Sequence, residues 1–196
     1  PTSTLKKFSY TGLANTTHTV AITTTVAGQQ HFVVGVDVHS GDGLSVSNLG
    51  VAGSNVSQWA AGTYYLLAEP IRKLAPALTF IQCQVNDATS GYTAAQWTTW
   101  MDAIIDTAKA SGECVLIVDP TPNPVAVSPY PAISNATWTS YRQAALDLAD
   151  AKGCMVLDMS QIYGPYSTTS GWMFDSVHPT VVGAEVIARA AADLIL

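Results

Sequence analysis

The chain has 196 residues, 48% of them apolar, which is enough to fill the core of one sizeable domain. Lys and Arg number 8 against 14 Asp and Glu, so a net charge of -6 offers no basic footprint for phosphate backbones or anionic lipid. No stretch approaches the roughly twenty apolar residues that span a bilayer. We therefore expect neither nucleic acid nor a membrane as a partner.

Residues 1–43 have the composition of a β-rich segment. Residues 8–38 are rich in Thr and Val and alternate apolar with polar positions, which predicts three short antiparallel strands. His18, His31 and His39 fall here without ligand spacing and are expected to be ordinary surface or edge residues. Because the chain begins at Pro1, without an initiator methionine, we expect a mature, trimmed or excised segment.

Residues 44–196 instead alternate strand and helix, and form the second predicted domain. Strands are predicted at 44–50, 77–85, 114–119 and 154–159, and helices at 56–74, 94–111, 135–152 and 180–196. Thr93 is the expected N-cap of the second helix, and proline is expected to end the first helix near Pro70 or Pro76. Short connections between alternating elements predict an α/β fold with a parallel sheet between helix layers.

Three cysteines, Cys83, Cys114 and Cys154, are too few and too scattered for a metal cluster, so we expect no metal site. Their simplest interpretation is as small buried apolar residues. Cys114 and Cys154 each begin a predicted strand, which leaves a disulfide between them open because spacing alone does not decide it.

Functional groups of such a sheet gather at the carboxyl ends of its strands. Asn86, in "QVNDA", follows a buried strand, where its amide could donate to a developing oxyanion; a helix cap is the alternative. Gly53, in "NLGVAGSN", could bring a backbone N–H close to a ligand, or could simply form a turn. Each of these two signals is weak alone.

The stretch "GWMFDSVHPT" holds the strongest candidates. His178 can shuttle a proton near neutral pH, and Asp175, three residues upstream, could hydrogen-bond one ring nitrogen and fix its tautomer. Pro179 suits the first turn of the final helix. The alternative is a solvated pair that caps this helix.

Taken in order, these motifs resemble the SGNH hydrolase family, the GDSL-like esterases and lipases, from about Leu44 to Leu196. "NLGVAGSN" is similar to the second block, "QVNDA" to the third block and "DSVHP" to the last block of the family. The resemblance implies a three-layer α/β/α flavodoxin-like fold, Asp175 and His178 as triad acid and base, Gly53 and Asn86 in the oxyanion hole, and no cofactor.

Two departures qualify the resemblance. Gln84 stands where the third block usually has glycine, and the Gly-Asp-Ser nucleophile motif is absent. The closest imitation, "HSGDGLS", has Gly43 in place of the serine, and too few residues separate Gly43 from Gly53 for the intervening helix and strand, which also excludes Ser40 and Ser45. We expect residues 1–43 to be part of a β-sandwich inserted between the first and second blocks, as in some phage-tail members.

The leading hypothesis is therefore a serine esterase that removes acyl groups, usually acetyl, from carbohydrate. This chain would supply the base, the acid and two oxyanion donors, while the nucleophile lies in a missing segment or a companion chain. The alternative is a non-catalytic carbohydrate-binding or structural module of a virion or cell surface. Low Lys content and abundant Ala and Thr favour an extracellular or virion-associated location.

Overall fold

The computed structural model describes residues 11–14, 16–17, 19, 45–61, 68–167 and 171–194. The chain divides into two compact units, Pro1–Val51 and Ala52–Leu196. The three strands predicted within residues 8–38, and His18, His31 and His39, lie outside the described residues. The second unit carries all the elements named below.

A parallel sheet forms the centre of the second unit. In the described part of the chain it has three strands, β1 (Leu78–Gln82), β2 (Glu113–Val118) and β3 (Met155–Asp158), in the order β1-β2-β3. Leu78 lies opposite Glu113 on one side of β2, and Val115 lies opposite Met155 on the other. The parallel α/β sheet predicted from the alternating pattern is confirmed.

Apolar side chains leave β2 on both faces, which explains its unbroken apolar sequence. Cys114, Leu116 and Val118 point into the larger core cluster, while Val115 and Ile117 point into a second cluster on the opposite face. Both faces of the strand are thus covered by helices.

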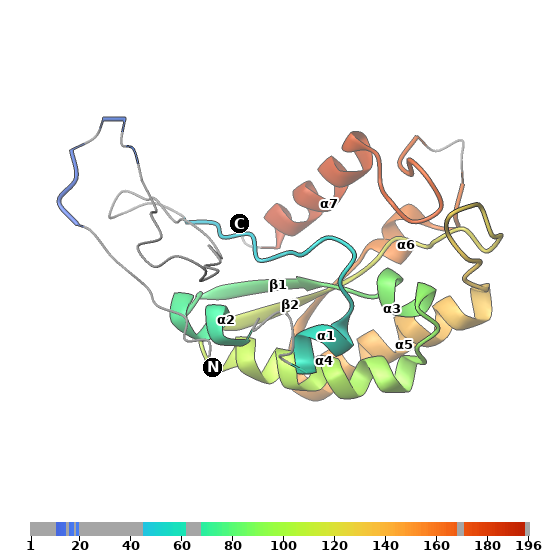
Figure 1. Ribbon diagram of the computed structural model, residues 1–196, viewed down its shortest axis with the longest axis horizontal. Helices are drawn as coiled ribbons and strands as arrows, with labels where there is room; N and C mark the ends of the chain where they lie inside the picture. The colour runs from blue at the N-terminus through green and yellow to red at the C-terminus, as the bar shows by residue number, and fades with distance from the viewer. Residues whose placement is uncertain are drawn as a thin grey trace, which may run out of the picture. The chain divides into compact units, whose positions relative to one another are not determined.

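Helices α4 (Ala94–Lys109) and α5 (Asn135–Lys152) cover the first face, and α7 (Val181–Asp193) packs through Val186 and Ile187 on the second (Figure 1). Together with the sheet they make the expected three layers.

The ends of the long helices follow local sequence signals. The side chain of Thr93 caps α4 and completes a capping box with Gln96. Helix α5 ends at Gly153, whose φ of 61° is the left-handed conformation that glycine adopts readily. The predicted cap at Thr93 and stop at Gly153 are confirmed.

Short helices complete the unit: α1 (Val56–Ala61), α2 (Ala68–Leu74), α3 (Val85–Thr89) and α6 (Met159–Tyr163). Helices α3 and α6 directly follow the carboxyl ends of β1 and β3 (Figure 1). The polar residues of the motifs therefore lie on short helices and loops at one end of the sheet.

Four local predictions were wrong. Residues 45–50 form no strand. Of the two helix ends predicted near proline, the one at Pro70 is wrong, because Pro70 lies in the first turn of α2, where its missing N–H needs no partner. The alternative agrees with the structure, since α2 ends at Leu74, two residues before Pro76. Asn86 is the second residue of α3 rather than a strand end. Pro179 precedes Thr180, the N-cap of α7, and bridges to Met173.

Candidate active site

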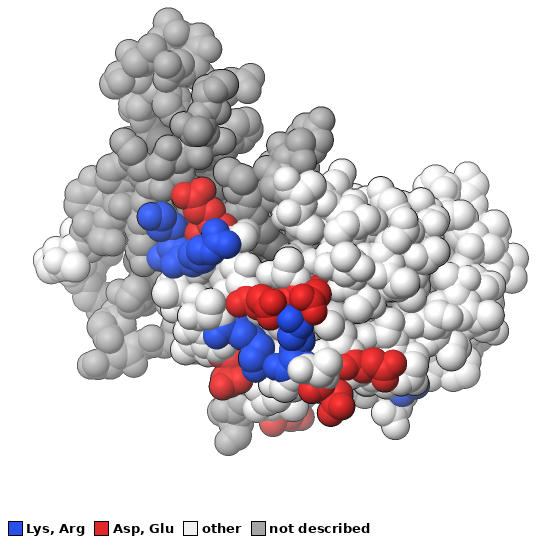
Figure 2. All heavy atoms as spheres, turned by 90° about the horizontal axis from the view of Figure 1, so that it is seen from below, with Lys and Arg blue, Asp and Glu red and all other residues white. Residues whose placement is uncertain are grey.

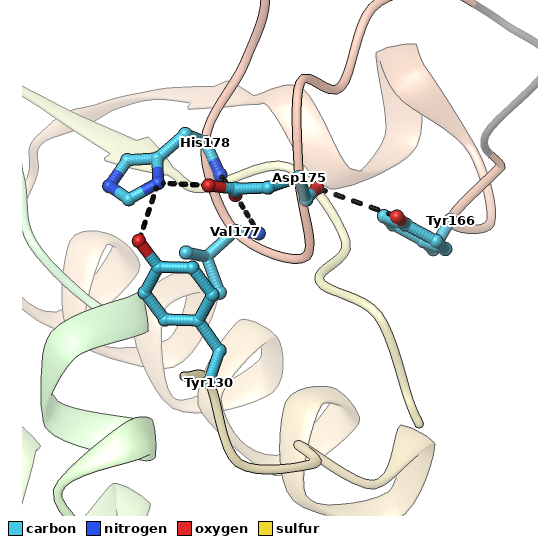
Figure 3. A network of polar contacts seen from close by, with 5 residues as sticks. All are labelled: Tyr130, Tyr166, Asp175, Val177 and His178. Carbon is cyan, nitrogen blue, oxygen red and sulfur yellow. Dashed lines mark hydrogen bonds and ion pairs between the residues drawn. The ribbon is translucent and has the colours of Figure 1, made fainter. Parts of the chain in front are cut away.

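Asp175 and His178 form a closed pair in the loop before α7 (Figure 3). Oδ2 of Asp175 lies 2.9 Å from Nδ1 of His178, and Oδ1 accepts the backbone N–H groups of Val177 (2.9 Å) and His178 (2.7 Å). Both carboxylate oxygens are thus engaged. This geometry matches a carboxylate that orients an imidazole, the arrangement expected from the Asp-x-x-His spacing.

The hydrogen bonds also set the charge of Asp175. Partial burial alone would raise its pKa, but the N–H of Val177 and the ring and N–H of His178 outweigh that effect and lower it. The carboxylate is therefore ionised at neutral pH. An ionised Asp175 accepts the Nδ1 proton, which leaves Nε2 of His178 as the basic nitrogen. The imidazole side chain is 58% exposed, so reactants can reach it.

Tyr130 makes a second contact with the imidazole (Figure 3). Its hydroxyl lies 3.5 Å from Nδ1 of His178, and the two rings meet edge to face with centroids 5.5 Å apart. Tyr166 contacts the other partner, donating to the carbonyl of Asp175 at 3.4 Å. No sequence pattern pointed to Tyr130, because it lies 48 residues from His178 in a loop without helical or strand periodicity.

Two backbone contacts hold the loop that carries Asp175 and His178 in place. The N–H of Asn123, after β2, donates to the carbonyl of Ser176 at 2.8 Å, and the N–H of Phe174 donates to the carbonyl of His178 at 2.8 Å. Tyr130 is held in turn by reciprocal backbone bonds with Val127 of 3.1 and 2.7 Å. The loop after β2 therefore contacts and supports the loop that carries His178.

Asn86 and Gly53 come together on the first strand's side of the sheet. The side-chain amide of Asn86 donates to the carbonyl of Ser54 at 2.9 Å, next to Gly53 in the chain. A primary amide has two N–H donors, so this bond leaves one for a ligand. Gly53 has a φ of 72°, and a Cβ there would meet no atom within 4 Å, so backbone conformation rather than space requires glycine.

Asp87 connects the segment that contains Asn86 to the segment that follows Gly53. Its buried carboxylate accepts the N–H of Val56, the first residue of α1, with both oxygens at 3.1 Å. Burial raises the pKa of Asp87 to about 6, and the Val56 N–H offsets part of that rise. Asp87 therefore caps the first turn of a helix that is distant in the sequence.

Gln84 and Asp119 connect the ends of β1 and β2. The buried carboxylate of Asp119 accepts the N–H groups of Gln84 and Val85, each at 3.0 Å, directly before Asn86. In turn, Oε1 of the Gln84 side chain accepts the backbone N–H of Asp119 at 3.0 Å. Burial raises the pKa of Asp119, although these N–H donors oppose the shift.

The predicted residues thus fall into two pairs, Asp175 with His178 and Gly53 with Asn86. A continuous series of contacts links the pairs through the loop after β2: Asp119 bonds the residues before Asn86, while Asn123 and Tyr130 contact the His178 loop. Both pairs belong to segments at the carboxyl end of the sheet, as the strand topology requires.

Two serines next to these pairs are unsuitable as nucleophiles. Ser54 is 4% exposed and its hydroxyl accepts the indole N–H of Trp59 at 2.8 Å, and Ser176 is 3% exposed. Neither presents a hydroxyl to an incoming substrate. Within the described ranges, no group of three or more His, Cys, Asp or Glu could hold a metal ion, and no helix is long and apolar enough to cross a membrane.

Comparison with known proteins finds one family whose model matches most of this chain. The model of the GDSL-like Lipase/Acylhydrolase family matches residues 21–186, so the match begins within the β-rich segment, ahead of Leu44. No curated protein sequence matches the chain.

Several solved structures share the fold. The acetylxylan esterase Axe2 of Geobacillus stearothermophilus is 17% identical with a TM-score of 0.59, over 76% of this chain and 70% of Axe2. The lipase/acylhydrolase of Enterococcus faecalis is 17% identical with a TM-score of 0.60, over 73% and 71%. LAE5, an α/β hydrolase from a lake metagenome, is 18% identical with a TM-score of 0.54, over 70% and 66%.

Three of the matching structures are catalytic mutants of Axe2, in which alanine replaces one serine, one histidine and one aspartate respectively. That aspartate lies three positions before the histidine.

Proposed function

Because the chain belongs to the GDSL-like lipase/acylhydrolase family of carboxylic ester hydrolases, we propose that it cleaves acyl esters of carbohydrate with Asp175 and His178 as acid and base. The observation that carries this proposal is the 2.9 Å contact between Oδ2 of Asp175 and Nδ1 of His178, with the carboxylate held by two backbone N–H groups. Axe2 has catalytic aspartate and histidine at the same spacing, which supports the assignment.

In the proposed reaction, Nε2 of His178 takes the proton of a serine hydroxyl as the serine oxygen attacks the ester carbonyl. The imidazolium that forms is stabilised by the ionised Asp175. His178 then gives the proton to the departing sugar oxygen as its bond to the carbonyl carbon breaks, which leaves an acyl-serine and a free sugar hydroxyl. The same nitrogen then takes a proton from a water molecule that attacks the acyl-serine, and returns it to the serine oxygen as the carboxylic acid is released.

We assign the oxyanion hole to the free N–H of the Asn86 amide and to the backbone N–H of Gly53. The bond from Asn86 to Ser54 fixes the amide plane in advance, so no reorganisation is needed when charge develops on the carbonyl oxygen. Asp87 and Asp119 support this arrangement by holding Val56, Gln84 and Val85.

The mechanism also requires a nucleophilic serine. The sequence has no Gly-Asp-Ser motif, and the two serines beside the proposed donors are buried. We propose that a segment absent from this sequence, or a companion chain, supplies the serine.

Uncharged polar and aromatic side chains around the proposed site favour a carbohydrate ester. Residues 120–134, after β2, are uncharged and rich in Pro, Val and Ser, with Tyr130 among them. Figure 2, seen from below, shows Lys, Arg, Asp and Glu side chains clustered on that face. Lys152, the last residue of α5, pairs with Asp102 and Asp106 of α4. A neutral acetylated sugar suits such surroundings, and Axe2 is an acetylxylan esterase.

A fluorophosphonate probe tests the proposal directly. The purified protein, with any companion polypeptide, is labelled and digested, and the modified residue is identified by mass spectrometry. Labelling of one serine, together with acetate release from acetylated xylo-oligosaccharides, is expected. The variant His178→Ala should abolish both. Turnover that persists in this variant would remove His178 from the mechanism.

A non-catalytic module is the second candidate, favoured by the missing nucleophile motif. In that case nothing is labelled, while xylo-oligosaccharides still bind and perturb the environment of Tyr130. For either function we propose an extracellular or virion-associated location, which fractionation of the producing cells and their particles would test.

A further inference from the structure

Cys114 and Cys154 lie side by side at the amino ends of two neighbouring strands. Val115 of β2 is opposite Met155 of β3, so one step back along both strands sets Cys114 opposite Cys154. Adjacent strands are about 4.8 Å apart, which lies within the Cα separation of roughly 4.4 to 6.8 Å that disulfides span.

Both side chains also point to the same face of the sheet. Cys114 is fully buried in the core cluster beneath α4 and α5, and Cys154 packs against the same cluster. Burial and a hydrogen bond with the Cys154 thiol raise the pKa of Cys114 to about 12. The two thiols therefore lie on the same side of neighbouring strands, and both are free in this structure.

We propose that Cys114 and Cys154 are an oxidation site at which a disulfide links β2 to β3. The register brings the Cα atoms within bridging range, and both side chains project from the same face of the sheet. This inference does not depend on the proposed hydrolase activity.

The oxidant we name is a small-molecule disulfide such as oxidised glutathione. Cys154 is the more accessible sulfur, so its thiolate attacks the small disulfide, forms a mixed disulfide and releases one thiolate. Cys114 then loses its proton and attacks Sγ of Cys154, which releases the second small thiol. Two protein thiols are oxidised by two electrons, and one small disulfide is reduced to two thiols.

Cys83 provides an internal control. In the register, Thr79 of β1 lies opposite Cys114, so Cys83 is four residues further along, or about 13 Å at 3.3 Å per residue. Its thiol contacts Asp87 at 3.6 Å, at the opposite end of the sheet. A bridge between Cys83 and either other cysteine would require backbone movement.

The bridge would close the segment that contains the loop after β2 and helix α5. This segment includes Asp119, Asn123 and Tyr130, which support the proposed active site. By restricting the unfolded chain, the bridge should raise the melting temperature by roughly 5 to 10 °C.

The test equilibrates the protein with excess oxidised glutathione, quenches with acid, and counts thiols after denaturation. We expect one free thiol, a peptide linking Cys114 to Cys154, and a higher melting temperature that dithiothreitol reverses. Cys83→Ser should keep this redox dependence, and Cys154→Ser should lose it. Three free thiols, a stable glutathione adduct on Cys154, or a bridge to Cys83 would each overturn the proposal, and all are read on the wild-type protein.

Discussion

Gln84 and Asp119 hold each other by reciprocal hydrogen bonds of 3.0 Å across the carboxyl ends of β1 and β2. Nε2 of Gln84 also donates to the carbonyl of Tyr141 in α5 at 3.1 Å. The residue that departs from the family's usual glycine therefore fills a buried position and joins three elements. It aligns the start of α3, on which Asn86 lies.

Replacing Gln84 with Ala should destabilise the fold. The substitution leaves the N–H of Asp119 and the carbonyl of Tyr141 without these partners in a buried region, which costs about 1 to 3 kcal/mol per group. Chemical denaturation measures the loss. Gln143→Ala, at an exposed position of α5, is the matched control and should change stability by less than about 0.5 kcal/mol. Equal stabilities for the two variants would contradict this role.

The variant Asp175→Asn should lower kcat by roughly 10⁴-fold with little change in the melting temperature. The asparagine carbonyl can still accept the N–H groups of Val177 and His178, but its NH₂ faces Nδ1 and favours the wrong tautomer. Acetate release measures kcat. Asp147→Asn, on the exposed face of α5, serves as the control. A wild-type rate in Asp175→Asn would show that the carboxylate does not orient His178.

Asn86→Ala should reduce kcat by about 10² to 10³-fold and leave KM nearly unchanged, because an oxyanion donor acts mainly in the transition state. Asn123→Ala removes a side-chain amide from the neighbouring loop, where it accepts the N–H of Val125, and should have a small effect. A rise in KM at constant kcat would instead assign Asn86 to ground-state binding.

The buried carboxylate of Asp87 should make stability fall as the pH rises from about 4 to about 6. Its folded pKa of about 6 lies above the ordinary aspartate value of 3.8, so the folded state holds its proton more tightly than the unfolded state in this window. The difference corresponds to about 3 kcal/mol, as an order of magnitude.

Denaturation midpoints at several pH values test this sign. Asp87→Asn should flatten the slope between pH 4 and 6. Asp175 acts in the opposite direction, because its lowered pKa stabilises the fold above pH 3.8 and that contribution is lost as the pH falls further. A slope unchanged by Asp87→Asn would exclude Asp87 as its source.

Tyr130 is expected to act as a positioning residue for His178. Tyr130→Ala removes the edge-to-face contact and should lower kcat by about 10 to 100-fold, whereas Tyr130→Phe keeps the ring and should recover most of the rate. Tyr166→Phe, which loses only a 3.4 Å bond to the carbonyl of Asp175, is the matched control. If Tyr130→Phe is as slow as Tyr130→Ala, the hydroxyl rather than the ring does the positioning.

Features that depend on neighbours along the chain could be predicted from the amino-acid sequence. Thr93 and Gly153 mark helix ends through their own side chain and backbone, and the apolar run of β2 reports burial on both faces. Asp175 and His178 are three residues apart, so one tight turn suffices to join them.

Contacts between residues distant in the sequence became visible only in the folded chain. Gln84 reaches Asp119 across 35 residues and Tyr130 reaches His178 across 48, and no periodicity encodes such partners. A hydrophobic pattern indicates which face of an element is buried, but strand order and register set its neighbours. For the same reason the spacing of Cys114 and Cys154 in the sequence did not show that they are neighbours. Their neighbouring positions follow from the pairing of β2 with β3.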